Sequence, residues 1–169
     1  MCKGCSAYNK RNNKQKHFLS RRHNLLLGLH TRILDTRNNL PLPADFREQF
    51  KDGVYITQGF DRNVMLLTRS AFDKVYQRVI AANLADPLAR MLSRMILGTA
   101  HEAEIAFDGE VPIPTTLKDF ASLAQDVVLV GLGDYVEVWS PELWIKQEEQ
   151  LLDAEANTSK FSSLVVTTR

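Results

Sequence analysis

The chain has 169 residues, of which 44% are hydrophobic, and this suits one globular domain or two small halves that share a core. No apolar run reaches the roughly 20 residues that a membrane-spanning helix needs, so we expect a soluble protein with no membrane partner. The net charge of +1 conceals an asymmetry, because residues 1–24 hold seven Lys or Arg side chains and no acid, whereas the other 145 residues hold 14 basic and 20 acidic side chains.

Residues 1–24 are rich in Lys, Arg and Asn and poor in aliphatic side chains, which predicts a basic, disordered N-terminal extension. The spacing of Cys2, Cys5, His17 and His23 in this segment is close to a zinc-finger pattern. A finger also needs a small apolar core between its ligand pairs, and only Tyr8 is available there. We therefore expect no bound metal. Because the body of the chain has no cysteine, a reducing cytoplasm is the expected compartment.

The first half of the body predicts, in order, a strand, a turn, a proline-bearing strand, a short helix and a hairpin. The expected ranges are 31–35, 36–39, 40–43, Ala44–Phe50, and Val54–Gln58 with Val64–Thr68. Gly59, Phe60 and Asp61 are the expected turn of the hairpin, and Ser70 is a plausible N-cap for the helix that follows.

Residues 71–97 predict one or two helices, broken near Asp86 and Pro87. Apolar residues recur there at helical spacing, and we expect them to pack in the core. They are Leu84, Leu88, Met91, Leu92, Met95 and Ile96.

The second half repeats the first with a period near 70 residues, since Pro41, Leu42 and Pro43 align with Pro112, Ile113 and Pro114. Phe46 then falls on Leu117, and Arg47 on Lys118. The same elements are therefore expected again. Their ranges are 102–110, Thr115–Ala124, and Val127–Val130 with Tyr135–Trp139, joined by a turn at 131–134 and closed by a helix with Ser140 as N-cap and Pro141 in its first position.

Prolines at alternate positions present one side of a strand without N–H donors. Such a strand suits a place where two units exchange or cross strands better than the middle of a flat sheet.

The segments "LGLHTRILDTRNNLPLPADFRE", "LGTAHEAEIAFDGEVPIPTTLKDFA" and "VVLVGLGDYVEVW" occur in an order and spacing that resemble the MraZ family of bacterial regulators. The resemblance covers about residues 25–149. It implies an α+β fold of duplicated AbrB/MraZ-like swapped-hairpin β-barrel units with peripheral helices. The domains expected from it are a first repeat with linking helices at 25–97, a second repeat at 98–150 and a flexible C-terminal tail at 151–169, preceded by the extension at 1–24.

Members of this family carry an Asp-x-x-x-Arg element in each half. Here the first half keeps Asp35 and the basic middle residue Arg37, but Asn39 stands at the arginine position. In the second half the two signature positions hold Ala106 and Glu110, with Asp108 between them, so this element has become acidic and is expected to be structural.

The resemblance implies DNA binding through these loops, and the first loop has suitable chemistry because Arg can recognise guanine and Asn adenine. Asp35 is expected to fix the loop by accepting hydrogen bonds from nearby N–H groups. The alternative is a solvated turn, since Asn also favours a positive φ. The candidate DNA-binding residues are Arg32, Asp35, Arg37, Asn38, Asn39 and Arg47.

One such loop is a weak DNA binder, and repetition around an oligomer would strengthen it. The resemblance implies a cytoplasmic, nucleoid-associated transcriptional regulator that binds double-stranded DNA as a homo-oligomeric ring. Its target would be short promoter repeats upstream of the division and cell-wall gene cluster. The alternative is a scaffold of the same fold that has lost specific DNA binding.

An enzyme is the contrasting class. The body has two histidines, His30 and His101, and no cysteine nucleophile, Gly-rich phosphate loop or metal-spaced carboxylate cluster. We therefore expect no catalytic residues, no cofactor and no small-molecule substrate.

Overall fold

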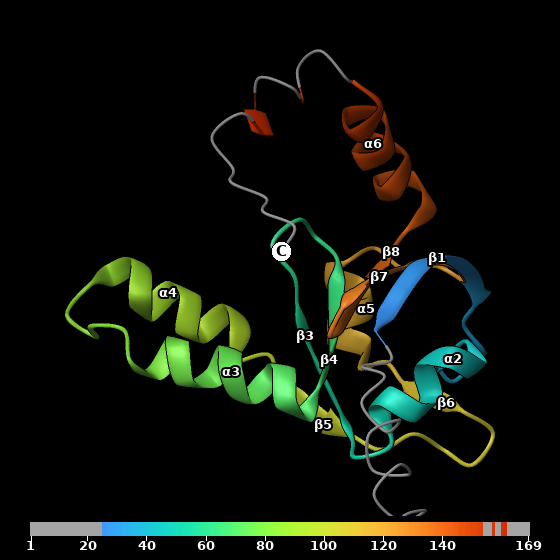
Figure 1. Cartoon of the computed structure of the whole chain (residues 1–169), viewed down its shortest axis with the longest axis horizontal. Coiled ribbons are helices and arrows are strands. Elements are labelled where there is room, and N and C mark those ends of the chain that lie inside the picture. Colours follow the sequence, from blue (N-terminus) through green and yellow to red (C-terminus); the bar gives the residue numbers. More distant parts are fainter. Residues whose placement is uncertain (1–24, 154–156, 158–159, 162–169) are drawn as a thin grey trace, which may run out of the picture.

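The computed structural model describes residues 25–153, 157 and 160–161. These residues form a mixed α+β fold with a six-stranded sheet, a separate two-stranded sheet and five α-helices (Figure 1). The N-terminal extension, with its four candidate metal ligands, lies outside the described residues, as does most of the expected C-terminal tail. Within the described part, no helix is long and apolar enough to cross a membrane.

The strands of the large sheet lie in the spatial order β1-β7-β8-β4-β3-β5, and every neighbouring pair is antiparallel. Their bounds are β1 Leu26–Ile33, β3 Val54–Gln58, β4 Val64–Thr68, β5 His101–Ala103, β7 Asp126–Gly133 and β8 Tyr135–Trp139. The small sheet pairs β2 (Asn39–Pro41) with β6 (Glu110–Pro112). The helices are α2 Ala44–Arg47, which continues as the 3₁₀ turn η1 Glu48–Phe50, then α3 Arg69–Ile80, α4 Pro87–Ile96, α5 Thr115–Phe120 and α6 Pro141–Leu152.

Each half of the chain pairs its first strand with the hairpin of the other half. β1 pairs with β7 over eight residues, from Leu26 opposite Gly133 to Ile33 opposite Asp126, and β5 pairs with β3. The two hairpins, β3–β4 and β7–β8, meet where β4 pairs with β8 in the middle of the sheet. The halves are therefore joined at both flanks and at the centre of the sheet.

The small sheet explains the alternate prolines. The amides of Leu42 and Ile113 donate across the strand pair to the carbonyls of Gly109 and Asn38, at 3.0 and 2.9 Å. Because amides along an antiparallel strand alternate between facing the partner and facing away, the nitrogens next to these two point outward. The prolines occupy such outward positions, so the ladder loses no hydrogen bond. They are Pro41, Pro43, Pro112 and Pro114.

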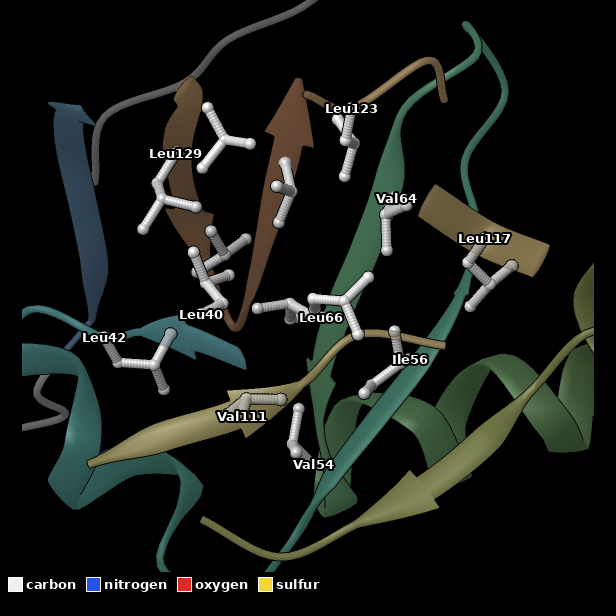
Figure 2. Close-up of a cluster of buried hydrophobic side chains, with 14 of the residues drawn as sticks. Leu40, Leu42, Val54, Ile56, Val64, Leu66, Val111, Leu117, Leu123 and Leu129 are labelled. Carbon is white, nitrogen blue, oxygen red and sulfur yellow. The ribbon is translucent and has the colours of Figure 1, made fainter. Parts of the chain in front are cut away.

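The core lies between the two sheets and is capped by the short helices, with side chains from both halves pointing into one cluster (Figure 2). Leu40 of β2 and Val111 of β6 are cross-strand partners at its centre, and both are fully buried. The surrounding side chains include Leu42, Phe46, Phe50, Val54, Ile56, Val64, Leu66, Leu117, Leu123, Leu129, Val136 and Val138.

The capping prediction is confirmed for α6 and wrong for α3. Ser140 caps α6 by accepting a hydrogen bond from the amide of Leu143 at 3.4 Å, and a proline takes the first helical position. The helix α3 begins at Arg69, before Ser70, and its N-cap is Thr68, whose hydroxyl accepts from the amide of Ala71 at 3.2 Å.

Other bounds also differ from the predicted ones, and the first strand, predicted at 31–35, is β1 at Leu26–Ile33 because its pairing with β7 covers that range. The helix α5 ends at Phe120 instead of Ala124, because Ser122 takes a left-handed φ of 53° and the amide of Leu123 bonds back to the carbonyl of Lys118. The strand β7 continues through the expected turn as far as Gly133, because its pairing with β1 extends that far.

The apolar stripe expected in the core is only partly buried. The break at Asp86 and Pro87 is confirmed, but α3 and α4 project from the body as a helical hairpin (Figure 1). Only the C-terminal end of α4 docks, where Ile96 is buried and its carbonyl accepts a hydrogen bond from the Thr57 hydroxyl at 2.7 Å. Three members of the stripe remain in solvent: Leu84, Leu88 and Met91 are 63%, 67% and 61% exposed.

Candidate nucleic-acid interface

The first loop, residues 35–39, is held by Asp35. One carboxylate oxygen accepts hydrogen bonds from the amides of Arg37 and Asn39, at 2.8 and 2.7 Å. The other accepts from Nδ2 of Asn39 at 2.9 Å. Asn38 takes a left-handed φ of 65°, which asparagine tolerates better than most residues. Asp35 thus has the geometry of the loop-fixing acceptor that the sequence predicts.

These hydrogen bonds make the loop sensitive to acid. Above all, the backbone amide of Asn39 holds the pKa of the Asp35 carboxyl below the usual value of about 3.9 for aspartate. Because the pKa of Asp35 is lower in the folded chain than in the unfolded one, the ionised carboxylate contributes stability to the loop at pH values above the usual pKa. This contribution is lost as the pH falls through the folded pKa. We expect the NMR shift of the Asn39 amide to titrate with a midpoint below about 3.9.

An Asp35→Asn variant supplies the control, because the amide shift of Asn39 should then show no such titration. A midpoint at or above the usual value of about 3.9 in the natural chain would contradict the role given to these hydrogen bonds.

Arg37 is the cation that this loop presents to solvent. Its side chain is 81% exposed, and its Nε lies 3.6 Å from a carboxylate oxygen of Asp35. An ion pair this open contributes little free energy, so the guanidinium is free to exchange the carboxylate for another anion. A backbone held in place and a mobile cation at its tip are what a phosphate or a base edge requires.

The first loop is also tied to the second half of the chain. Nζ of Lys118, on α5, donates to Oδ1 of Asn38 at 2.7 Å, and Nδ2 of Asn38 lies 3.5 Å from the hydroxyl of Thr115. The side chains of Asn38 and Asn39 therefore hold the loop together instead of standing free in solvent. Lys118 is absent from the predicted site, although its alignment with Arg47 in the repeat marks it as an equivalent position.

Arg47 does not flank the first loop, and that part of the prediction is wrong. Its Nε donates to the carbonyl of Leu42 at 3.1 Å, and its guanidinium lies against Gly109 of the second loop. A Cβ atom on Gly109 would lie 2.2 Å from Nε of Arg47. Because β2 and β6 pair antiparallel, the end of each strand lies beside the start of the other, and the helix that follows each strand reaches the loop of the other half. Arg47 and Lys118 thus occupy reciprocal places.

The second loop, residues 106–110, forms the same turn with the opposite charge. The amide of Gly109 donates to the carbonyl of Ala106 at 2.8 Å, as that of Asn38 does to Asp35 at 3.0 Å. Its acids are Asp108, whose carboxylate accepts from the amide of Glu110 at 3.3 Å, and Glu110 itself. Phe107 is fully exposed at the tip, a feature that no pattern in the sequence indicates. Two acids at this turn would repel phosphate.

The remaining candidate, Arg32, lies in β1 opposite Val127 and donates from its guanidinium to the carbonyl of Thr31 at 2.7 Å. The structure therefore brings Asp35, Arg37, Asn38 and Asn39 into one loop, places Arg32 in the strand that leads into it and Arg47 at the other loop. DNA contact by these residues stays a prediction. The histidines His30 and His101 lie on opposite edge strands of the large sheet and do not form a pair.

Comparison with known proteins finds relatives of this chain. The family model described as "MraZ protein, putative antitoxin-like" matches residues 96–165. A protein of Thermomicrobium roseum named "Transcriptional regulator MraZ" is 35% identical over 131 residues, which cover 78% of this chain and 92% of the relative. Proteins of the same name from Roseiflexus castenholzii and Salinispora arenicola are 32% and 34% identical, covering 82% and 78% of this chain and 94% and 90% of theirs.

Proposed function

Because this chain belongs to the MraZ family, we propose that it is a transcriptional regulator that binds double-stranded DNA through the loop around Arg37. The observation that carries the proposal is the exposed guanidinium of Arg37 on a turn that Asp35 holds from within and Lys118 holds from the other half. Such a loop holds the backbone that carries Arg37 in one conformation, which lowers the backbone entropy lost on binding. The proposed role needs no catalytic group and no cofactor.

We propose further that the chain consists of two swapped-hairpin units, at 25–97 and 98–150, between the extension at 1–24 and the tail at 151–169. The exchange of β1 and β5 between the halves supports this, and so do the matching turns at 35–39 and 106–110. The same pseudo-symmetry relates Lys118 to Arg47. One unit would then keep a DNA-binding loop while the other has become a structural support.

One exposed arginine in each first loop gives weak binding, so the proposal includes a homo-oligomeric ring that presents several copies of this loop to promoter repeats. Each loop that binds raises the effective concentration of the next one, and affinity can rise by about 10² to 10⁴ without any new kind of contact. The repeats would need to be spaced as the loops are, and the assembly would act on the nucleoid.

The proposal is tested by Arg37→Ala. We expect this change to weaken binding to the DNA upstream of the gene by roughly tenfold per bound loop, because it removes one phosphate or base interaction worth about 1–3 kcal/mol. The slope of log affinity against log salt should also become shallower by about 0.9 for each phosphate that the variant no longer neutralises. Fluorescence anisotropy with a labelled duplex, at several salt concentrations, measures both quantities.

A matched control is Arg62→Ala, which removes an exposed arginine from the β3–β4 turn and should leave affinity unchanged. A scrambled duplex of the same composition reports the sequence-independent part. Equal affinity of Arg37→Ala and the natural chain would remove this loop from the interface.

The alternative function is a scaffold of the same fold without specific DNA binding. The observation that favours it is the engagement of both asparagine side chains with Asp35 and Lys118, which leaves few groups for base edges. The natural chain decides between the two functions. Equal affinity for the upstream and scrambled duplexes at low salt would select the scaffold.

A further inference from the structure

The strand β5 lies at the edge of the large sheet, with β3 as its neighbour (Figure 1). The amide of Gln58, in β3, points toward this edge, since it donates to the Thr99 hydroxyl at 3.3 Å. The next amide, that of Gly59, donates the other way, to the carbonyl of Asn63 on the β4 side, at 2.8 Å. Because amides along an antiparallel strand alternate between its two sides, the even-numbered residues of β3 bond to β5.

The same alternation leaves the backbone of Glu102 facing outward. Val54 and Ile56 lie opposite Ala103 and His101, so these pairs exchange the hydrogen bonds between β3 and β5. Glu102 lies between them, and its N–H and C=O therefore point away from β3, to a side where the described chain has no further strand. A free N–H and C=O at a sheet edge can pair with an added strand.

The side chains of this segment alternate between acidic and apolar. Glu102 and Glu104 are exposed, whereas Ala103 and Ile105 are half-buried and pack against the core. A cleft of about 790 Å³ adjoins these four residues. The edge thus presents carboxylates at alternate positions, apolar groups between them, and space beside both.

Glu102 is held in place by two groups of its own chain. Arg69 forms an ion pair with its carboxylate, and the hydroxyl of Tyr55 donates to the same carboxylate at 3.0 Å. The ring of Tyr55 is in turn stacked on that of Phe72, with centroids 4.1 Å apart. A strand edge fixed in this way loses little conformational entropy when a partner binds.

The remaining charges of this edge favour a basic partner. Two further cations line the cleft, but Lys51 pairs with Glu48 at 2.7 Å and Nε of Arg47 donates to a backbone carbonyl at 3.1 Å. Glu104 forms no ion pair with any residue that the structure describes. Residues 101–110 hold four acids and no Lys or Arg. Opposite charges on neighbouring strands attract, so a positive side chain fits beside Glu104.

We propose that the outer edge of β5 binds an extended segment of a partner protein as an added antiparallel strand. The partner residue opposite Glu102 exchanges two backbone hydrogen bonds with it. Cross-strand partners share a side, so Lys or Arg at this and every second position lies beside the acids. The residues between them are apolar and lie beside Ala103 and Ile105. This binding goes beyond the proposed function and does not depend on DNA contact by the first loop.

Three fluorescein-labelled peptides of alternating lysine and valine test the proposal. One is unmodified, one carries N-methyl groups on its lysines and one carries them on its valines, so all three have the same charge. Because the lysines lie opposite Glu102, methylation of their nitrogens blocks the hydrogen bonds to β5, whereas methylation of the valine nitrogens blocks only the far edge. Fluorescence anisotropy with the full chain should show binding of the unmodified and valine-methylated peptides. The lysine-methylated peptide should bind roughly tenfold more weakly or worse.

Glu104→Lys locates the site on the chain. The variant replaces an attraction by a repulsion, so we expect it to weaken the unmodified peptide by roughly 2- to 30-fold. Glu148→Lys makes the same change at an exposed position of α6 and should leave affinity unchanged. Both positions are exposed, so far-UV circular dichroism should report an unchanged fold. A peptide of alternating glutamate and valine should prefer the Glu104→Lys protein to the natural chain.

Four results would overturn the proposal. The first is that the natural chain binds none of the lysine peptides. The second is equal binding of the two methylated peptides, because charge alone would then attract them. The third is an equal loss of affinity in Glu104→Lys and Glu148→Lys, which would move the site away from β5. The fourth is full displacement of the probe by an equimolar peptide of residues 1–24, which would assign the edge to the chain's own basic extension.

Discussion

Replacing Leu40 by Ala is expected to lower the free energy of unfolding by about 2–5 kcal/mol, a large share of the roughly 5–15 kcal/mol typical of a domain. Leu40 is fully buried in β2 and lies opposite Val111 of β6, where the two halves pair. The loss includes the transfer of the removed methyl and methylene groups and the cavity that they leave. Since both halves line that cavity, we expect both to lose stability together.

The tryptophans make this measurable. Trp139 and Trp144 are the two tryptophans of the chain, and both lie in the second half, whereas Leu40 lies in the first. Urea unfolding followed by tryptophan fluorescence should shift to lower concentration by the same amount as unfolding followed by circular dichroism. All samples should have the same protein concentration, because the proposed assembly would contribute to apparent stability.

Leu152→Ala is the matched control, since it makes the same change at an exposed position near the end of α6 and should cost less than about 0.5 kcal/mol. A Leu40→Ala protein whose fluorescence transition stays in place while the circular dichroism moves would show that the halves unfold separately. The shared core would then be the wrong description of this fold.

Gly131→Ala is expected to release β1 from the sheet. A Cβ atom at this position would lie 2.7 Å from the carbonyl carbon and 2.8 Å from the carbonyl oxygen of Leu26. These are backbone atoms and cannot turn aside as a long side chain can. We expect a loss of about 1–3 kcal/mol, as for other overpacked sites, concentrated in the pairing of β1 with β7.

Amide hydrogen exchange locates the effect, because residues 26–33 should exchange roughly 5- to 100-fold faster in the variant, which corresponds to the same loss of about 1–3 kcal/mol. Gly133→Ala separates the two possible causes of faster exchange, which are a steric clash with β1 and backbone strain in β7. Gly133 also lies in β7 and has a φ of 100°, but a Cβ there would meet nothing within 4 Å. Its replacement strains the backbone without touching β1. Equal protection of β1 in both variants would contradict the close approach.

Two elements that depend on local chemistry agree with their predictions. The hairpin strands Val54–Gln58 and Val64–Thr68 have their predicted bounds, because apolar residues run up to turn residues on both sides. The break at Asp86 and Pro87 agrees because the capping carboxylate and the proline act within one helical turn.

Two of the features that the sequence does not predict depend on partners far along the chain. Periodicity shows that Leu88 and Met91 share a side of α4, but it does not show whether anything packs against that side. The segment 131–134 has the composition of a turn, and pairing with β1 makes most of it a strand.

The site illustrates the same limit. The sequence predicts Asp35 as a loop acceptor because an Asp two to four residues before the amides that it binds is a local pattern. The hydrogen bond from Lys118 to Asn38 joins positions 80 residues apart, so no local pattern predicts it. Proximity along the chain wrongly predicts that Arg47 lies beside the first loop. The antiparallel pairing of β2 with β6 brings Lys118 to the first loop and Arg47 to the second.

The pairing of β1 with β7 also constrains how the chain is made. The strand with Leu26 leaves the ribosome early, but its partner Gly133 is synthesised more than a hundred residues later, which at about 5–20 residues per second is a delay of several seconds. Throughout that delay the apolar residues of β1 have no strand to cover them. Nascent chains of this protein should therefore depend on chaperones that hold exposed apolar segments, and the dependence should end once β7 and β8 emerge.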